Sequence, residues 1–309
     1  MIHRFGRFRL RVSRSKPRGG LLSPHAEGIA LVVFTACAWG LTWPQSKFLL
    51  TMLPPFSMRA ACGVSACAVT FVIAGLRGEK LWPPRDQWGR LLLFGMLNYG
   101  LFIVLNTLSL VWLRASEAVV ITYTLPVWAS LLAWPMLGER PTVRKILALV
   151  LALGGVALLV GADADGASWR TLPAAGLSLA AAFCFGLGTV LAKKHPLRLP
   201  PATGAAWQAL MGMLLVVVLA SFEHPRWGNV TAEGWASIAF IAAIPLSVAY
   251  LTWFRALRLV PASTAATTVL LSPVVGVIGS GVLLGETFGP RQIVALVTTL
   301  AGVALAARG

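Results

Sequence analysis

Polar and aromatic side chains recur at helical spacing inside apolar stretches of this sequence, and they are the first candidates for chemistry. Trp39, Thr42 and Trp43 share one face of a helix, because residues three and four apart are neighbours on its surface. Asn98 and Asn106 lie two turns apart on another helix. Such groups can stack on a small polar molecule and hydrogen-bond to it, which is binding rather than bond-making chemistry. The predicted cavity wall comprises Trp39, Thr42, Trp43, Asn98, Asn106, Tyr123, Trp207, Tyr250, Thr267 and Thr268.

Helix packing is the alternative explanation for the same residues. Ser, Thr and Gly let two membrane helices approach closely, and their side chains hydrogen-bond across the interface. The spacing alone leaves binding and packing both open.

The residue sets that catalysis or metal binding would need are missing from these stretches. Cys37, Cys62, Cys67 and Cys184 form no C-x-x-C pair, and all four histidines lie outside the apolar stretches. No Walker lysine loop for a nucleotide is present. We therefore predict no enzyme activity, no metal site and no cofactor. Energy coupling stays open between uniport, substrate exchange and coupling through Glu117, the acid nearest to the middle of an apolar stretch.

The composition places these stretches in a membrane. Hydrophobic residues make up 57% of the 309 residues, charged residues only 12%, and the mean hydropathy is +0.79. Soluble domains usually carry about 25% charged residues. A bilayer core of about 30 Å needs about 20 helical residues. Ten stretches meet that length, which predicts an all-α polytopic membrane protein; they are 28–47, 56–76, 90–111, 117–137, 144–161, 173–192, 202–222, 235–254, 262–284 and 291–307.

The cations orient these ten stretches. With the N-terminus inside, 20 of the 26 Lys and Arg residues face the cytoplasm, which predicts cytoplasmic N- and C-termini. Residues 1–27 read as a basic cytoplasmic tail; a transit peptide is a weaker alternative, and a nucleic-acid arm is weaker still. The Arg-rich and Ala-rich usage favours a bacterial inner membrane. We predict the lipid bilayer and a small-molecule substrate as partners and no nucleic acid, and no pattern predicts the oligomeric state.

The sequence also contains an internal repeat. Residues 113–158 align with 260–305 at an offset of 147 without a gap, with 18 identities in 46 positions. The repeat holds five stretches, which is an odd number, so the second copy enters the membrane from the other side. The sequence therefore predicts two inverted five-helix repeats over residues 28–161 and 173–308, an architecture typical of secondary transporters.

Both halves carry related motifs. The first half reads A-W-G at 38–40, L-P-V-W-A-S-L-L at 125–132 and L-G-E-R at 137–140; the second reads P-A-S-T-A-A at 261–266, L-S-P-V-V-G at 271–276 and L-G-E at 284–286. With these motifs the chain resembles the EamA-type members of the drug/metabolite transporter superfamily. The resemblance implies ten helices in two inverted repeats, a central substrate cavity and, usually, export of small metabolites.

Two repeated motifs are candidates for moving parts. Pro126 and Pro273 fall within predicted spans, where each removes a backbone donor; we interpret them as hinges, with a static bend as the alternative. Gly138-Glu139 and Gly285-Glu286 end one helix and precede the next. Gly suits a left-handed cap and an acid suits the start of the following helix, so we favour a structural role over a gate salt bridge with Arg140, Arg144 or Arg291.

These observations predict an integral membrane secondary transporter that exports a small metabolite by alternating access. A lipid scramblase or a non-transporting membrane partner is the alternative.

Overall fold

The computed structural model describes residues 23–138, 142–160, 168–260, 264–265 and 268–307. Regular structure within these ranges is helical throughout. Seven segments are long and apolar enough to cross a membrane, and three shorter apolar helices accompany them. This arrangement fits the predicted all-α fold of ten membrane helices.

The first repeat makes five crossings, and its helices begin where the sequence supplies caps. The Ser23 side chain accepts a hydrogen bond from the Ala26 amide at 3.2 Å, and Pro24 occupies the first turn, so α1 begins four residues before the predicted position 28. The elements are α1 (Pro24–Leu49); α2 (Pro55–Leu76); η1 (Arg85–Gln87), α3 (Trp88–Gly95), η2 (Met96–Leu101) and α4 (Phe102–Trp112); α5 (Ala115–Thr122) and α6 (Leu125–Leu137); and α7 (Val143–Val160).

The second repeat follows the same order. Its elements are α8 (Ser168–Lys194); α9 (Pro201–Ala220); η3 (Trp227–Asn229), α10 (Ala232–Ala243), η4 (Ile244–Val248) and α11 (Ala249–Ala256); α13 (Leu271–Leu284); and α14 (Pro290–Ala307). The third and eighth crossings are each interrupted by a π-helical turn, η2 and η4, at corresponding positions of the two repeats. A π turn in the middle of an α-helix is rare and often lies at a functional site.

Pro126 and Pro273 differ from the prediction of a kink within a continuous helix. The fourth crossing stops at Thr122 and resumes at Leu125, so Pro126 is the second residue of α6. Pro273 is the third residue of α13, after a turn at Val269 and Leu270. A proline in a first helical turn lacks an amide that would have no helical partner there, so it starts a half-helix instead of bending one. Their role as hinges stays a prediction.

Reciprocal contacts relate the two repeats by a pseudo-two-fold axis. Glu79, which follows α2, accepts hydrogen bonds from the Thr203 amide (2.8 Å) and hydroxyl (3.1 Å) in the first turn of α9. Glu223, which follows α9, accepts bonds from the Ser57 amide (2.6 Å) and hydroxyl (2.7 Å) in the first turn of α2. An acid of each repeat therefore bonds to the equivalent helix of the other, and such reciprocal contacts are expected for a two-fold relationship.

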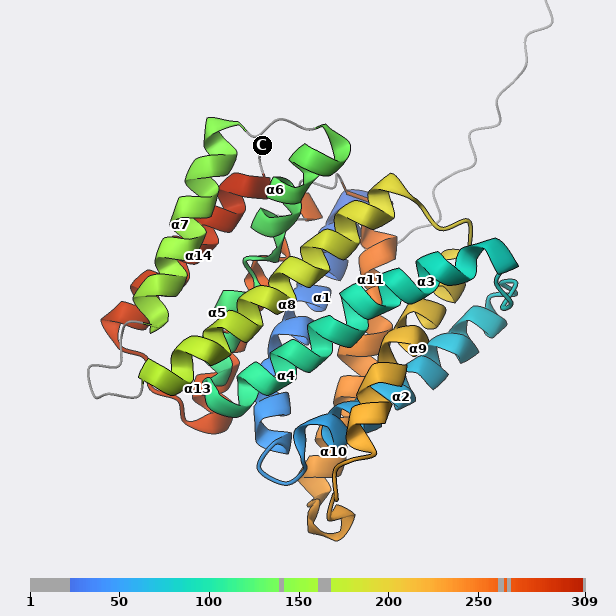
Figure 1. Cartoon of the computed structure of the whole chain (residues 1–309), viewed down its shortest axis with the longest axis horizontal. Coiled ribbons are helices and arrows are strands. Elements are labelled where there is room, and N and C mark those ends of the chain that lie inside the picture. The colour runs from blue at the N-terminus through green and yellow to red at the C-terminus, as the bar shows by residue number, and fades with distance from the viewer. Residues whose placement is uncertain (1–22, 139–141, 161–167, 261–263, 266–267, 308–309) are drawn as a thin grey trace, which may run out of the picture.

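The α7–α14 pair repeats this reciprocity. A Cβ on Gly155 would lie 2.2 Å from the Thr299 hydroxyl, and a Cβ on Gly302 would lie 2.6 Å from the Ala152 amide nitrogen. Only glycine permits such an approach, because any side chain would overlap the facing helix. Figure 1 shows α7 and α14 side by side at one edge of the molecule.

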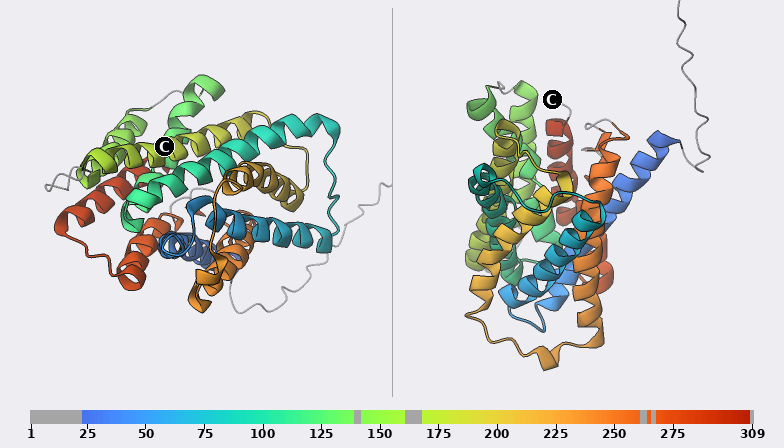
Figure 2. Two further views of the ribbon diagram at one scale, coloured as in Figure 1. Left: turned by 60° about the horizontal axis from the view of Figure 1, so that its bottom comes forward. Right: turned by 90° about the vertical axis from the view of Figure 1, so that its right-hand side faces the viewer.

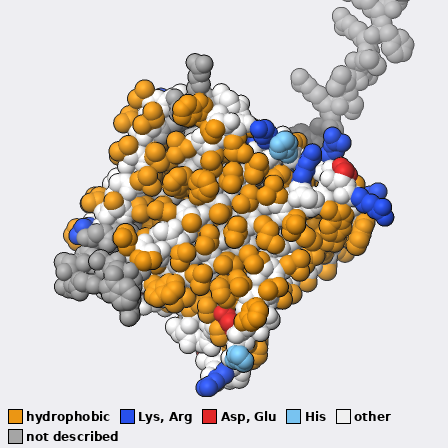
Figure 3. Space-filling model, viewed as in Figure 1, with side chains coloured by type: hydrophobic (Ala, Val, Ile, Leu, Met, Phe, Trp, Pro, Cys, Tyr) orange, Lys and Arg blue, Asp and Glu red, His pale blue; other side chains and the backbone are white. Residues whose placement is uncertain are grey.

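The molecule has two polar ends separated by an apolar surface. We define the basic end as the one where α1 begins, α2 ends, α9 begins and α11 ends; it carries Arg77, Arg255 and Arg258. At the opposite end α1 ends, α2 begins and α9 ends. Figure 2 shows α1 beginning and α14 ending on the same side. Figure 3 shows a continuous hydrophobic surface between Lys and Arg side chains at the upper right, the basic end, and a few charged groups at the lower tip. The chain is therefore a multi-pass membrane protein.

Candidate transport cavity

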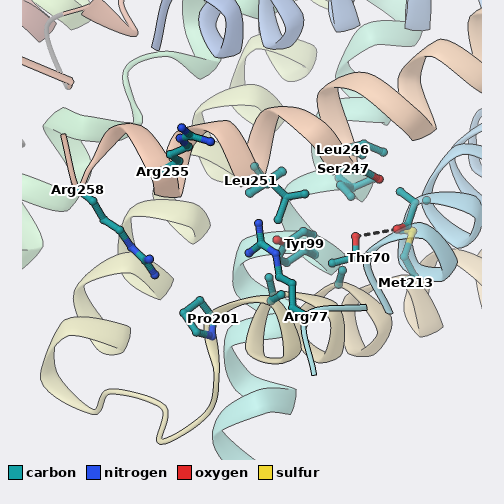
Figure 4. A pocket seen from close by; sticks show the side chains of 17 residues that line it. Thr70, Arg77, Tyr99, Pro201, Met213, Leu246, Ser247, Leu251, Arg255 and Arg258 are labelled. Carbon is teal, nitrogen blue, oxygen red and sulfur yellow. Dashed lines mark hydrogen bonds between the residues drawn. The ribbon is translucent and has the colours of Figure 1, made fainter. Parts of the chain in front are cut away.

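A cavity of about 220 Å³ lies between helices of both repeats (Figure 4). The first repeat contributes α2, η2 and α4 to its wall, and the second contributes α9, η4 and α11. It runs from the exposed Arg77 and Arg258 at the basic end to the buried Met213 and Ser247. Its mouth therefore faces the basic end and its floor lies inside the bundle.

Tyr99 and Tyr250, one from each repeat, pack against each other at the wall of this cavity. Their ring centroids are 6.2 Å apart in a stacked arrangement. Trp39 of α1 lies behind Tyr250, with centroids 5.3 Å apart, and its indole nitrogen donates to the Pro245 carbonyl at 3.1 Å. The π turn takes some carbonyls out of the usual helical pairing, and side chains satisfy them: the Ser247 hydroxyl donates to the Ala242 carbonyl at 2.7 Å. The interrupted helices thus fix the aromatic rings at the cavity.

A second cavity of about 240 Å³ adjoins the first and shares Tyr99, Tyr250, Pro201 and Ala205 with it. Asn98 lines this second cavity, and its side-chain oxygen is buried without a hydrogen-bond partner among the described residues. That oxygen packs against α8, since a Cβ on Gly188 would lie only 2.0 Å from it. Tyr99 and Tyr250 therefore lie where the two cavities meet, and Asn98 lies beside them on the wall of the second.

The charge of the cavity is positive. Arg77, Arg255 and Arg258 line the mouth of the first cavity, and neither cavity has an Asp or Glu among its described lining residues. All three arginines are exposed, and Arg255 forms an ion pair with Glu27 of α1. A solute that enters from the basic end therefore meets guanidinium groups first.

The structure brings only part of the predicted wall together. Asn98 and Tyr250 line the cavities, and Trp39 supports Tyr250 from behind. Asn106 instead accepts a hydrogen bond from Thr122 at 2.6 Å within the bundle, and Trp43 packs in a hydrophobic core around α5. In this structure both residues contact other helices, and neither lines the two cavities described; their role in binding stays a prediction.

Four of the remaining predicted residues also lie away from the cavity wall, and the fifth is not described. The Trp207 indole donates to the Leu81 carbonyl at 2.7 Å and packs among other aromatic rings near the basic end. Thr42 and Thr268 donate to the carbonyls of Ala38 and Thr264 in their own helices. Tyr123 packs beside the core around α5, and Thr267 lies outside the described residues.

The sequence did not single out four residues that line the first cavity, namely Tyr99, Arg77, Arg255 and Arg258. Tyr99 directly follows Asn98, but regular helical spacing placed it on another face. The π turn changes that geometry, because it holds one more residue per turn than an α-helix. The charge distribution assigns the arginines to the cytoplasmic side and gives them no binding role. Their position directly after the ends of apolar stretches was the one feature of the sequence that could have placed them at a cavity mouth.

The Gly-Glu motifs combine a predicted cap with an unexpected partner. Gly138 and Gly285 end their helices with φ of 75° and 67°, the left-handed conformation predicted for them. Glu286 accepts a bond from the Ala115 amide (2.9 Å) in the first turn of α5 and lies 3.7 Å from Arg114. The carboxylate is therefore stabilised by the dipole of a helix, as predicted, but that helix is α5 of the other repeat. The sequence could not specify this partner. Glu139 lies outside the described residues.

Comparison with known proteins agrees with this arrangement. The model of the EamA-like transporter family matches residues 26–161 and 172–308, one copy per repeat. "Uncharacterized transporter YvbV" of Bacillus subtilis is 27% identical over 286 residues, which is 91% of this chain and 92% of that protein. The "Probable amino-acid metabolite efflux pump" of Salmonella typhimurium is 25% identical over 285 residues, 88% of this chain and 92% of that protein. A crystal structure at 20% identity covers 90% of this chain and 96% of its own with a TM-score of 0.66, which shows a shared fold. Because the family model covers both repeats, the chain belongs to the EamA-like transporter family.

Proposed function

We propose that the protein is a secondary transporter that exports a small metabolite from the cytoplasm by alternating access. The observation that carries this proposal is the cavity between the two repeats, whose mouth faces the basic end and whose floor is buried. The positive-inside rule assigns the basic end to the cytoplasm, which gives cytoplasmic termini and an inward-open conformation.

Contacts at the opposite end support this conformation. Glu223 bonds to the first turn of α2, and Glu286 bonds to the first turn of α5. The Lys47 ammonium donates to the carbonyls of Leu110 (2.7 Å) and Leu113 (2.9 Å) at the end of α4. On the side away from the mouth, these charge-assisted bonds join the end of α9 to α2, the end of α13 to α5, and α1 to the end of α4.

Alternating access follows from the pseudo-two-fold axis. The axis relates α9 and α11 of the second repeat to α2 and α4 of the first. If the two repeats exchange conformations, the cavity closes at the basic end and opens at the opposite end. Switching then requires the closing contacts to form at one end while they break at the other.

The cavity's chemistry supports a small polar or amphipathic solute. Tyr99 and Tyr250 offer aromatic rings with hydroxyls, Asn98 adds an amide to the wall of the second cavity, and Ser247 lies at the floor of the first. The name of the Salmonella relative, a metabolite efflux pump, agrees with this size class. We place the protein in a bacterial inner membrane, and we propose transport without a catalytic step.

Flux through purified protein in liposomes tests the proposal. We expect saturable counterflow of at least one small amino acid or its oxo-acid derivative, and a Tyr250→Ala variant should lose it. Tyr123→Phe is a matched control, because Tyr123 is absent from both described cavity walls. Flux that never saturates, together with fast bleaching of labelled inner-leaflet lipid by dithionite, would instead establish lipid scrambling.

A further inference from the structure

Arg59 is a cation within the apolar part of α2, near the opposite end of the molecule. It lies one turn after Pro55, where the helix begins, and it is partly buried. Its Nε donates to the Thr107 hydroxyl at 2.8 Å, and the described residues include no carboxylate in an ion pair with it. A guanidinium inside a membrane helix is costly and usually serves a function. The positive-inside rule does not explain it, because this end faces away from the cytoplasm.

The pseudo-two-fold axis gives Arg59 a counterpart in the known cavity. Pro54-Pro55 corresponds to Pro200-Pro201, and both pairs start a helix whose third residue bonds to an acid of the other repeat. The same offset of 146 places Arg59 on Ala205. Ala205 lines both cavities at the basic end. Arg59 therefore occupies the wall position of a cavity that would open at the opposite end.

The hydrogen bond of Arg59 joins the two helices that such an opening would separate. Thr107 lies on α4, and α4 corresponds to α11 of the second repeat. At the basic end, α9 and α11 form opposite parts of the cavity wall. Their counterparts α2 and α4 are instead bonded through Arg59 and Thr107. Opening at this end would break the bond and leave the guanidinium facing the solute.

We infer that the transported solute is a small organic anion and that Arg59 binds its negative charge when the cavity opens at the opposite end. The inference rests on the proposed transport function. At the basic end Arg77 and Arg258 line the mouth, so an anion meets a guanidinium at both ends of its path. Between them lie the neutral groups of Asn98, Tyr99 and Tyr250. The planar fork of N–H donors on a guanidinium matches a carboxylate, whereas a cationic solute would be repelled.

Counterflow of three solutes with the same carbon skeleton tests this inference. The full chain is reconstituted in liposomes and supplied with 4-methyl-2-oxopentanoate, an anion, with leucine, a zwitterion, or with leucinamide, a cation. We expect wild-type protein to carry the anion saturably and to exclude leucinamide. Arg59→Gln should slow anion counterflow by at least about tenfold, since it loses a charge-assisted bidentate contact. Arg59→Lys should keep the maximal rate and raise the half-saturation concentration about threefold or more, since the charge remains and the fork is lost.

Two variants separate the roles of charge and folding. Thr107→Val removes only the partner hydroxyl and should retain anion counterflow. Arg226→Gln removes an exposed arginine near the opposite end and should match wild type. Should Arg59→Gln fail to assemble, the solute preference of wild type and the half-saturation of Arg59→Lys still decide the matter.

Each outcome has a defined consequence. Saturable flux of leucine or leucinamide without the oxo acid would leave transport intact and overturn the anion assignment. Wild-type anion flux in Arg59→Gln would overturn the role of Arg59 alone. No saturable flux of any of the three solutes would overturn both this inference and the proposed function in its present form.

Discussion

The carboxylate contacts between the repeats allow a quantitative test of the pseudo-two-fold arrangement. We consider Glu223→Gln and its counterpart Glu79→Gln. Glu223 accepts bonds from the Phe56 amide (3.1 Å), the Ser57 amide (2.6 Å) and the Ser57 hydroxyl (2.7 Å). Hydrogen bonds to a charged group contribute about 1.5–3 kcal/mol and neutral ones about 0.5–1.5 kcal/mol. Glutamine keeps one acceptor oxygen but loses the charge and about 0.3–1 kcal/mol of interaction with the helix dipole.

The expected cost follows from these contributions. The carboxylate is partly exposed, so solvent screening reduces the sum, and Glu223→Gln should lower the free energy of unfolding by about 1–3 kcal/mol. Glu79→Gln should act in the same direction but less strongly. Its bonds to the Ala202 amide (3.4 Å), the Thr203 amide (2.8 Å) and the Thr203 hydroxyl (3.1 Å) are longer.

Unfolding by SDS in mixed micelles, followed by tryptophan fluorescence, measures both effects. A double-mutant cycle of Glu223→Gln with Ser57→Ala isolates the contact and should give a coupling energy of about 0.5–2 kcal/mol. Glu233→Gln removes an exposed acid from the first turn of α10 near the same end, and it serves as the control for the loss of a charge at a helix start. Additive mutations in the cycle, or opposite signs for Glu223→Gln and Glu79→Gln, would refute the reciprocal contacts.

Three further substitutions test packing and binding. Gly155→Ala should lower the unfolding free energy by about 1–3 kcal/mol, because its Cβ would overlap α14. Gly154→Ala should not lower it, because its Cβ meets no atom within 4 Å and alanine favours a helix more than glycine does. Trp43→Ala should lower the unfolding free energy by about 3–5 kcal/mol. A change in solute affinity without that loss would indicate that Trp43 contacts the solute instead of packing in the core. Tyr250→Phe should raise the half-saturation concentration about three- to tenfold through one lost hydrogen bond, and unchanged counterflow kinetics would show that its hydroxyl does not contact the solute.

The membrane character of the chain and its duplication could be predicted from one sequence, because both depend on local composition. Apolar runs of bilayer length identify membrane helices whatever their neighbours are. The identities between 113–158 and 260–305 revealed the repeat, and an odd number of crossings made it inverted. The glycine caps at Gly138 and Gly285 were also local, since left-handed backbone favours glycine.

The cavity wall depended on how helices face one another. Asn98 and Asn106 share a helix, yet only Asn98 lines a cavity, because the π turn between α3 and α4 changes which side chains share a face. Glu286 was predicted to interact within its own repeat and instead bonds to α5 of the other.

The sequence by itself determined that ten apolar helices in two inverted halves enter a bilayer. The free energy of transferring an apolar residue from water depends on its own type and not on its neighbours in the fold. The tertiary structure decided which polar groups face a cavity and which hydrogen-bond to one another. It also decided the surroundings of Arg59, a cation whose place the positive-inside rule does not explain. Those assignments depend on contacts between helices far apart in the chain, such as Arg59 with Thr107 and Tyr99 with Tyr250, and helical periodicity contains no information about them.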